Sequence, residues 1–379
     1  MWQTINTPLY SHKQEQDLDL YRTFCKVLLT SQKQRDRDFM KKLYDVVVLR
    51  SLATVMVVAF HAYGLMYWDN FPDMTERYKD LYYAINQYVL NFRMPLFVFI
   101  SGFLFSFLEQ EKNKYPTFVA LFKNKFKRLI IPYFVFTAIY MLTTGMEFSF
   151  KILISGWLAH LWFIPTLFWC FMFTRLSCFL PYSHTRYFKA ALLAISFILL
   201  FINLPKLGIL GIQFFQEWFF WFYFGYVISP YRNQLYDYLN KRKFWLLIFI
   251  ATYSLELLYT TRFVECEEER GGYVNFAHVA IVLFIWYFTN RAIRSSNKAW
   301  YKSAVFKELN KTSYGIYVLH YWLQTLLLSS SIKELLQLNT FATNHVFLFP
   351  FLFFLTTLAL SYIGTKVLLK TEVGRFLIG

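Results

Sequence analysis

Ten long apolar stretches limit what this chain can fold into. The sequence has 379 residues, of which 57% are hydrophobic and 22% aromatic. Each stretch is close to the length, about 20 residues, that an α-helix needs to cross the hydrocarbon core of a bilayer. The stretches are Tyr44–Trp68, Leu81–Leu108, Leu129–Met146, His160–Leu180, Phe188–Leu204, Leu207–Ser229, Phe244–Thr261, Tyr273–Asn290, Ser313–Ser330 and Val346–Leu369. We therefore expect an all-α polytopic membrane protein with about ten transmembrane helices, embedded in a lipid bilayer.

The basic residues predict how such a protein is oriented. The net charge is +16, from 39 Lys and Arg against 23 Asp and Glu. Most of the Lys and Arg lie before the first stretch, in every second loop after it, and in the C-terminal tail. By the positive-inside rule, both termini face the cytoplasm. The excess positive charge thus indicates topology, and no nucleic-acid partner is expected.

The same pattern suggests a division of the chain into three parts. Residues 1–43 are polar and are expected to form a cytoplasmic arm, for which an interfacial helix and a disordered segment are both open interpretations. Residues 44–369 form the expected ten-span domain, and residues 370–379 a short cytoplasmic tail.

Two ionisable residues share one face of the first apolar stretch. Arg50 and His61 are separated by roughly three helical turns, about 16 Å along the axis, and therefore lie on one stripe of the helix. Ionisable groups inside a bilayer are costly and normally face a protein interior or a wet cavity. We expect both to line a polar passage. The alternative is that the Arg50 side chain extends back to the near membrane surface and His61 caps the far end of the helix.

The second apolar stretch carries a buried cation next to a proline. Its segment from Asn91 includes Arg93, Pro95 and Ser101-Gly102. Proline inside a helix predicts a break with freed backbone groups, and glycine allows a neighbouring helix to approach closely. Arg93 is then either a structural cation paired with a carboxylate or a group lining the same cavity as His61.

A lysine-rich loop, residues 109–128, precedes the third stretch. Lys125 and Arg128 lie at its end, on the expected cytoplasmic side. Together with Arg50 they are candidates for binding the phosphates of an anionic ligand. The alternative is that the loop only anchors the chain at lipid headgroups.

Two further histidines stand in aromatic surroundings, His160 beside Trp162 and His320 beside Tyr317. Each is either a packing residue or part of the substrate cavity. The full set of cavity candidates is Asn91, Ser101, His160, Trp162, Tyr317 and His320. The histidines and carboxylates do not form the spacings of a metal site, so no metal is expected.

Taken in order, these segments resemble the acyltransferase-3 family of multispanning membrane acyltransferases. The motifs that carry the resemblance are Arg50 with His61, FRMPLFVFISGFL at Phe92–Leu104, the basic loop leading to RLIIPY at Arg128–Tyr133, HLWFIP at His160–Pro165, and SYGIYVLH at Ser313–His320. They extend over most of the chain. Two positions depart from the family pattern: Lys125 replaces the first arginine of an Arg-x-x-Arg motif, and Val47 stands where many members have an acid.

The resemblance implies an enzyme that moves an acyl group, usually acetyl, from cytoplasmic acyl-coenzyme A to a hydroxyl of a cell-surface or exported glycan. A lipid-linked sugar is another possible acceptor, and the inner membrane of a bacterium is the expected location. It also implies that His61 is the essential histidine and Arg50 its partner. We expect His61 to act as general base, with Arg93 either stabilising the oxyanion or holding the acceptor. A covalent acyl-histidine relay is the alternative mechanism.

A membrane transporter or flippase for a polar or anionic solute is the alternative function. Ionisable residues inside the membrane would suit it equally well. Transporters often show matching broken helices in two halves, whereas this sequence has Pro95 in its first half and no clear counterpart in the second.

Overall fold

A computed structural model describes residues 44–68, 70–202, 207–242, 244–262, 271–296 and 300–379. The chain divides between Asp45 and Val46 into two units, and the second unit comprises residues 46–379. The expected N-terminal arm lies outside the described residues, and the predicted domain boundaries stay predictions.

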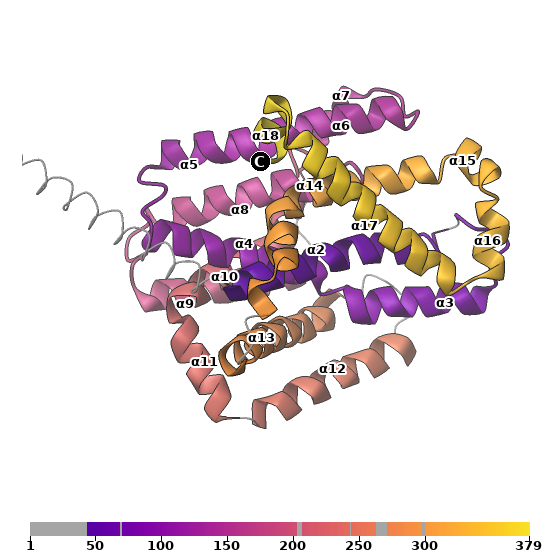
Figure 1. The fold of residues 1–379 in the computed structure, drawn as a ribbon. Helices are drawn as coiled ribbons and strands as arrows, with labels where there is room; N and C mark the ends of the chain where they lie inside the picture. Colours follow the sequence, from indigo (N-terminus) through magenta and orange to yellow (C-terminus); the bar gives the residue numbers. More distant parts are fainter. Residues whose placement is uncertain (1–43, 69, 203–206, 243, 263–270, 297–299) are drawn as a thin grey trace, which may run out of the picture. The chain divides into compact units, whose positions relative to one another are not determined.

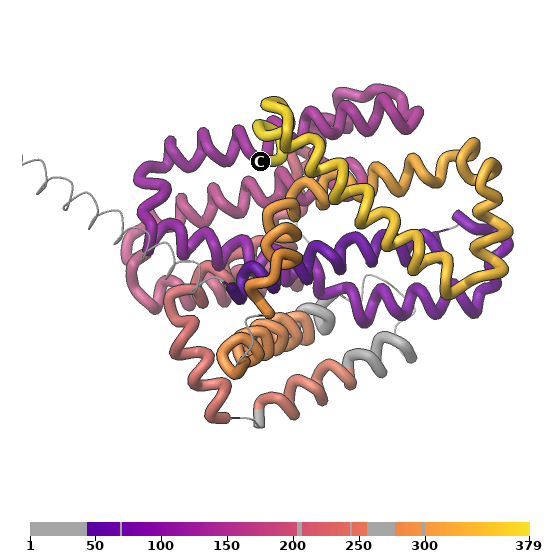
Figure 2. The backbone as a smooth tube through the Cα atoms, viewed as in Figure 1, coloured from indigo at the N-terminus to yellow at the C-terminus, as the bar shows by residue number. Residues whose placement is uncertain are grey.

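The described residues form helices and no strand (Figures 1 and 2). The α-helices are α2 (Tyr44–Gly64), α3 (Glu76–Ile85), α4 (Arg93–Gln110), α5 (Phe118–Lys125), α6 (Ile131–Thr143), α7 (Phe150–Ser155), α8 (Phe163–Ser177), α9 (Arg186–Ile198), α10 (Phe215–Ile228), α11 (Arg232–Lys241), α12 (Phe244–Arg262), α13 (Gly271–Ser295), α14 (Ala304–Leu327), α15 (Ser330–Leu335), α16 (Leu338–Asn344), α17 (Leu348–Leu368) and α18 (Glu372–Ile378). Short π-helical segments are η1 (Asn86–Leu90) and η2 (Phe126–Ile130). The 3₁₀ segments are η3 (Ala159–Trp162), η4 (Leu199–Phe201), η5 (Ile212–Phe214), η6 (Ser229–Tyr231) and η8 (Trp300–Lys302).

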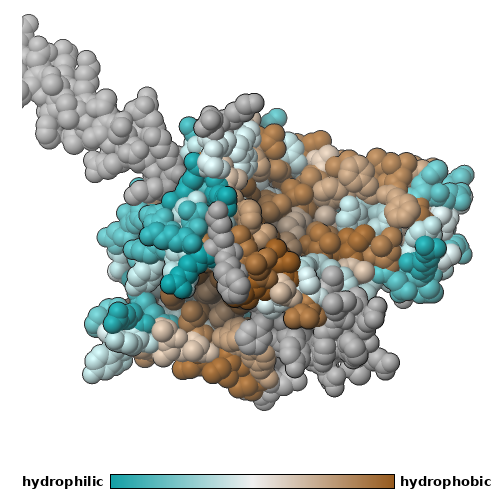
Figure 3. All heavy atoms as spheres, turned by 90° about the horizontal axis from the view of Figure 1, so that it is seen from below, coloured by the Kyte–Doolittle hydropathy of each residue, from teal (hydrophilic) through white to brown (hydrophobic). Residues whose placement is uncertain are grey.

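Five helical segments of the described part are long and apolar enough to cross a membrane. They are Tyr44–Gly64, Glu76–Gln110, Phe118–Thr143, Phe150–Ser177 and Leu348–Leu368. On the face shown in Figure 3, hydrophobic residues gather between two hydrophilic ends. The expected all-α membrane fold is therefore confirmed. The count of ten spans and the side on which the termini lie stay predictions.

One expected span starts later than its hydrophobicity suggested. Between Leu207 and Ser229 the chain is helical only from Ile212. Leu210 and Gly211 have φ of 46° and 71°, in the left-handed region that ends or interrupts a right-handed helix. Their backbone N–H groups donate instead to carbonyls of α7, at 2.7 and 3.1 Å. The first residues of this apolar stretch thus bond to the end of α7 instead of forming a helix.

Helices α4 and α10 touch through two glycines. A Cβ built on Gly102 of α4 would lie 1.8 Å from the carbonyl oxygen of Phe222, and one on Gly225 of α10 would lie 2.0 Å from that of Phe99. Backbones can approach this closely only where side chains are missing, as at small-residue contacts between membrane helices. The expected close packing at Gly102 is confirmed. It fixes the helix that starts at Arg93.

Helices α14 and α17 meet along a seam of small and hydroxylated residues. Thr357, Ser361 and Thr365 of α17 are fully buried, and each hydroxyl donates to the carbonyl four residues earlier, at 2.6–2.8 Å. Their polar groups are therefore satisfied within the helix. Gly315 of α14 packs against this seam, since a Cβ there would lie 2.4 Å from Thr365 Cγ2.

The end of α2 that carries His61 is covered by a hydrophobic cluster. It joins Ala62, Leu65 and Met66 to residues from α3, α16 and α17; the other members are Phe71, Met74, Tyr82, Ala342, Phe349 and Phe353. A hydrogen bond from the Tyr82 hydroxyl to the Val346 carbonyl, at 2.5 Å, ties α3 to the start of α17. This packing fixes the direction in which α2 presents His61.

Candidate active site

Three histidines from distant parts of the sequence meet in one cluster, in which His61 is partly exposed. His61 comes from α2, His160 from η3 and His320 from α14. The ring centroids of His61 and His320 are 5.2 Å apart, those of His160 and His320 4.9 Å, and those of His61 and His160 6.5 Å. His160 is 4% exposed and His320 is fully buried. We call these three residues the histidine cluster.

Hydrogen bonds to backbone carbonyls determine which nitrogen carries the proton in two of these rings. His160 Nε2 lies 3.0 Å from the Val318 oxygen, and His320 Nδ1 lies 2.7 Å from the Tyr317 oxygen. A carbonyl only accepts, so both nitrogens donate N–H, and the other nitrogen of each neutral ring holds a lone pair. Those nitrogens, His160 Nδ1 and His320 Nε2, are buried and have no hydrogen-bond partner within the described chain.

A strained backbone residue precedes His160. Ala159 has φ of 43°, in the left-handed region where a residue with a side chain costs about 1–2 kcal/mol. The Tyr317 hydroxyl donates to the His160 carbonyl, and the His160 ring donates to the Val318 carbonyl. Two bonds from the same turn of α14 therefore hold η3 in this conformation, which is the kind of strain that persists where the surroundings over-determine it.

Aromatic side chains surround the rings of the histidine cluster. The Tyr321 ring centroid lies 4.9 Å from that of His61 and 5.3 Å from that of His160, and the Trp68 ring lies 6.0 Å from His61. Trp68 is 37% exposed, so it stands at the edge of the site rather than inside it. Gly64 makes room for its indole, because a Cβ there would come within 2.6 Å of the Trp68 ring.

Arg93 places a buried guanidinium beside the histidine cluster. Its Nη1 donates to the carbonyls of Leu90 and Asn91, at 3.2 and 3.5 Å, and its guanidinium carbon lies 3.1 Å above the Phe60 ring. The Phe60 ring in turn lies edge-on to His61, at 5.3 Å. In the described part of the chain no carboxylate pairs with Arg93, and its Nε has no partner. A cation–π contact and two carbonyls thus take the place of a counter-ion.

The break that positions Arg93 precedes it rather than following it. The chain is π-helical over Asn86–Leu90, and α4 starts at Arg93 itself. Pro95 lies in the first turn of α4 and has no N–H to donate to the Asn91 carbonyl four residues earlier, which accepts from Arg93 Nη1 instead. The prediction of a broken helix with freed backbone groups is correct: the proline leaves the Asn91 carbonyl without an N–H partner, and the π-helical turn that ends at Leu90 adds to the break.

A second group of cations gathers around Lys125. Its Nζ lies 3.5 Å above the Phe171 ring and 5.3 Å from the Tyr115 ring. Lys114, Arg128 and Arg50 are near enough for their charges to act on it. The structure thus brings together the three residues proposed for phosphate binding and adds Lys114. We call these four residues the basic cluster.

Nearby carboxylates are paired elsewhere and leave the basic cluster positive. Glu109 forms an ion pair with Arg175 and accepts a hydrogen bond from the Tyr226 hydroxyl at 2.8 Å. Glu111 pairs with Arg232, at 3.0 Å. Both acids lie in or just after the last turn of α4, next in sequence to the lysine-rich loop. Within the described residues, these ion pairs join both acids to residues outside the basic cluster, so an incoming anion would meet excess positive charge there.

The remaining predicted residues lie outside the histidine cluster. Ser101 donates to the Phe97 carbonyl of its own helix, at 2.9 Å, and Trp162 stacks against Phe214 and Trp218. Asn91 contributes its backbone carbonyl to Arg93. The sequence analysis missed Trp68 and Tyr321. Trp68 follows His61 by seven residues, a spacing that would share one face of a continuous helix, but α2 ends at Gly64 and a turn brings the indole back to the His61 ring.

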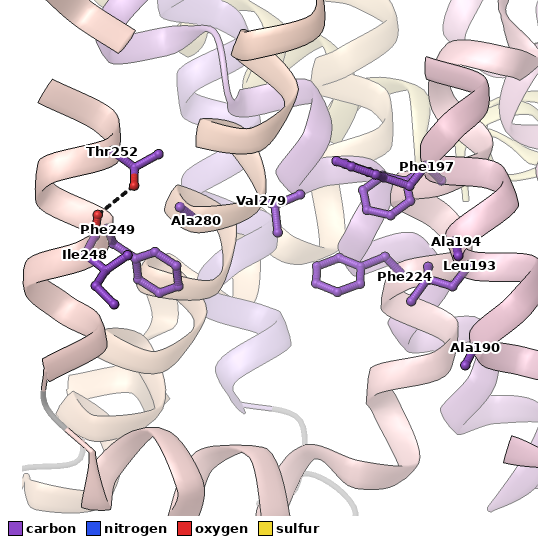
Figure 4. A pocket seen from close by; sticks show the side chains of 11 residues that line it. Ala190, Leu193, Ala194, Phe197, Phe224, Ile248, Phe249, Thr252, Val279 and Ala280 are labelled. Atoms are coloured by element: carbon purple, nitrogen blue, oxygen red, sulfur yellow. Dashed lines mark hydrogen bonds between the residues drawn. The ribbon is translucent and has the colours of Figure 1, made fainter. Parts of the chain in front are cut away.

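An apolar groove lies apart from both clusters. It has a volume of about 510 Å³ and is lined by residues of α9, α10, α12 and α13 (Figure 4). Its only hydroxyl, on Thr252, donates to the Ile248 carbonyl at 2.8 Å. The groove therefore offers nothing to orient a reacting group. No set of three His, Cys, Asp or Glu side chains in the described residues is arranged to hold a metal ion.

These features define a multi-pass membrane protein with a buried histidine–arginine centre and a separate basic cluster. Residues 43–366 match a family model described as an acyltransferase domain, Acyl_transf_3, so the chain belongs to the acyltransferase-3 family. Comparisons with curated proteins and with solved structures give no match.

Proposed function

We propose that this protein transfers an acyl group, acetyl in the simplest case, from cytoplasmic acyl-coenzyme A to a hydroxyl of a surface or exported glycan. Family membership supports the reaction class. The single observation that carries the proposal is the juxtaposition of His61 with Arg93 through the Phe60 ring. It places a base beside a cation that pairs with no carboxylate of the described residues.

The basic cluster is the proposed site for the phosphates of the acyl donor. Lys125 is held over aromatic rings and surrounded by other cations, an arrangement that costs free energy until an anion binds. Arg50 belongs to the same helix as His61, about 16 Å away along its axis. A donor whose phosphates rest at Arg50 could therefore extend its pantetheine arm along α2 toward the histidine cluster.

The proposed chemistry follows from the side chains at the histidine cluster, where the acyl group of the donor would lie. Neutral His61 takes the proton of the acceptor hydroxyl while the oxygen attacks the thioester carbonyl. The oxygen of that carbonyl gains negative charge, which the Arg93 guanidinium stabilises in a site shielded from water. An acyl-histidine relay through His61 is the covalent variant of this reaction.

The test uses purified protein in lipid nanodiscs with radiolabelled acetyl-coenzyme A and surface glycan from cells that carry the gene. His61→Ala should abolish transfer of label and leave membrane insertion intact. His345→Gln is the control, because His345 is an exposed histidine at the end of α16 whose ring packs against Phe341, outside the histidine cluster. Transfer that survives His61→Ala would overturn the role of His61.

Binding of the donor gives a separate test. Labelled acetyl-coenzyme A should bind the unmodified protein and should bind Arg50→Ala much more weakly. A transporter of another solute would show no such binding. Acid quenching of the reaction separates the general-base mechanism from the acyl-histidine relay, since only the relay leaves label attached to the protein.

A further inference from the structure

We infer that His320 is a positioning residue for His61: its Nε2 lone pair accepts a hydrogen bond from the imidazolium that His61 becomes during acyl transfer. This inference rests on the proposed function. It assigns a partner to His61 that the motif of Arg50 and His61 does not contain.

The first step is the fixed tautomer of His320. Its Nδ1 donates to the Tyr317 carbonyl at 2.7 Å and lies 3.2 Å from the Ile316 carbonyl. Both oxygens belong to α14, the helix that carries His320, so these contacts fix the orientation of the ring as well as its tautomer. The lone pair is thereby kept at Nε2, on the opposite side of the ring from its own backbone.

The second step is that this lone pair is unused. His320 is fully buried, and its Nε2 has no hydrogen-bond partner in the described residues. His61 Nδ1 is buried without a partner as well. The two rings are 5.2 Å apart between centroids, nearer than the 6.5 Å between His61 and His160. A rotation of the His61 ring that turns Nδ1 toward His320 Nε2 would join two groups that otherwise lack partners, and buried polar groups are rarely left that way.

The third step is the charge around His61. The groups that act on it electrostatically are His320, Arg93 and His160, and none is an anion. The remaining ring neighbours, Phe60, Tyr321 and Trp68, carry no charge. Arg93 opposes a second positive charge on His61, so the imidazolium needs an acceptor at its other nitrogen. In Ser-His-Asp enzymes a carboxylate fills this position, and here a neutral imidazole is the group available.

Atoms and protons balance without any charge on His320. The acceptor oxygen forms a bond to the acyl carbon, its proton moves to one nitrogen of His61, and the carbon–sulfur bond breaks. His61 then gives this proton to the coenzyme A thiolate, which leaves as the thiol. His320 accepts a hydrogen bond from the second nitrogen of His61 throughout and never receives the proton.

Three substitutions of His320 separate this role from a structural one. His320→Asn keeps an amide donor near the position of Nδ1 and so can restore the bond to the Tyr317 carbonyl. His320→Gln reaches the position of Nε2 and supplies an acceptor oxygen there. His320→Phe keeps the ring and offers neither group.

Initial rates of label transfer are measured for the three variants, with His345→Gln as the control. His320→Phe and His320→Asn should lower kcat by about 10²-fold, within the range for general-base assistance. His320→Gln should recover most of the rate, and the KM for acetyl-coenzyme A should stay unchanged in all three. Recovery by Asn and not by Gln would show that the histidine only supports α14, and would overturn the inference.

A second measurement does not depend on activity. The chain has seven histidines, so ¹⁵N-histidine labelling gives a small set of signals that single substitutions assign. The expected tautomers are N–H at Nδ1 for His320 and at Nε2 for His160. The opposite tautomer at His320 would overturn the inference even in an active protein. Absence of any transfer by the unmodified protein would overturn the proposed function, and with it this role.

Discussion

The contact between α4 and α10 makes a sharp prediction for Gly225→Ala. The new Cβ would lie 2.0 Å from the Phe99 carbonyl oxygen, and the nearby Phe103 nitrogen is 2.9 Å away. Ordinary contact begins at about 3.4 Å, so the helices must separate by about 1.4 Å at this point, and both atoms are backbone and cannot rotate aside. Overpacking of this kind costs about 1–3 kcal/mol. The higher helix propensity of alanine offsets about 1 kcal/mol of this cost, so the free energy of unfolding should fall by about 0–2 kcal/mol.

The larger effect of Gly225→Ala should be on catalysis. Helix α4 begins at Arg93, so moving α4 shifts the guanidinium relative to Phe60 and His61. A misplacement of about 1 Å can lower a rate by about 10²-fold. We therefore expect a modest fall in the thermal unfolding midpoint in nanodiscs together with a loss of transfer activity of about that size.

Gly364→Ala on α17 is the matched control for this experiment. A Cβ there meets only Leu319 Cδ1, at 3.3 Å, which is the end of a flexible side chain. The control should be as stable as the unmodified protein or slightly more stable, because only the gain in helix propensity remains. Equal stability and equal activity for Gly225→Ala and Gly364→Ala would show that α4 and α10 are not in backbone contact.

Two further predictions concern charged residues. Lys125→Met should raise the KM for acetyl-coenzyme A by about 10- to 100-fold, as expected when a charged phosphate contact of about 1.5–3 kcal/mol is lost. Lys125→Arg should retain most of the affinity, and Lys123→Met, at an exposed position on the same helix, should have no effect. An unchanged KM for Lys125→Met would show that the basic cluster does not bind the donor. Glu308 accepts a hydrogen bond from Lys366 at 2.6 Å, which lowers the pKa of its carboxyl. The ionised carboxyl therefore stabilises the fold at pH values above the pKa of the unfolded state, about 4.3. This contribution disappears as the pH falls through the lower pKa of the folded state. Glu308→Gln should therefore flatten the dependence of the unfolding midpoint on pH in this acid range, and an unchanged slope would contradict the pairing.

Much of the fold could be predicted because a bilayer permits few alternatives. Hydrophobic runs of spanning length have to be helices, and the runs that contain α2, α4 and α17 are. The small-residue rule predicted the contact at Gly102, since a glycine on a membrane helix has few other uses. Exact helix starts could not be predicted, because they depend on local backbone such as the positive φ of Leu210, which follows from its bonds to α7.

The site was harder to predict because its neighbours are distant in sequence. Helical periodicity places Arg50 and His61 on one face, but it does not say what that face meets. That His160 and His320 both meet His61 follows from the packing of η3 and α14, for which the sequence has no periodic signal. The pairing of Glu109 with Arg175, which leaves the basic cluster uncompensated, is likewise a tertiary contact between helices that no spacing rule relates.

The bonds at Ala159 determine which parts of the site can move together. His160 is tied to α14 by its own ring and by the Tyr317 hydroxyl, although it precedes α8 in sequence. His160 and His320 therefore travel with α14, whereas His61 and Arg93 belong to α2 and α4. A shift of α14 would carry two histidines away from the third only after the hydrogen bonds of Ser51 and Gln324, which join α2 to α14, had broken.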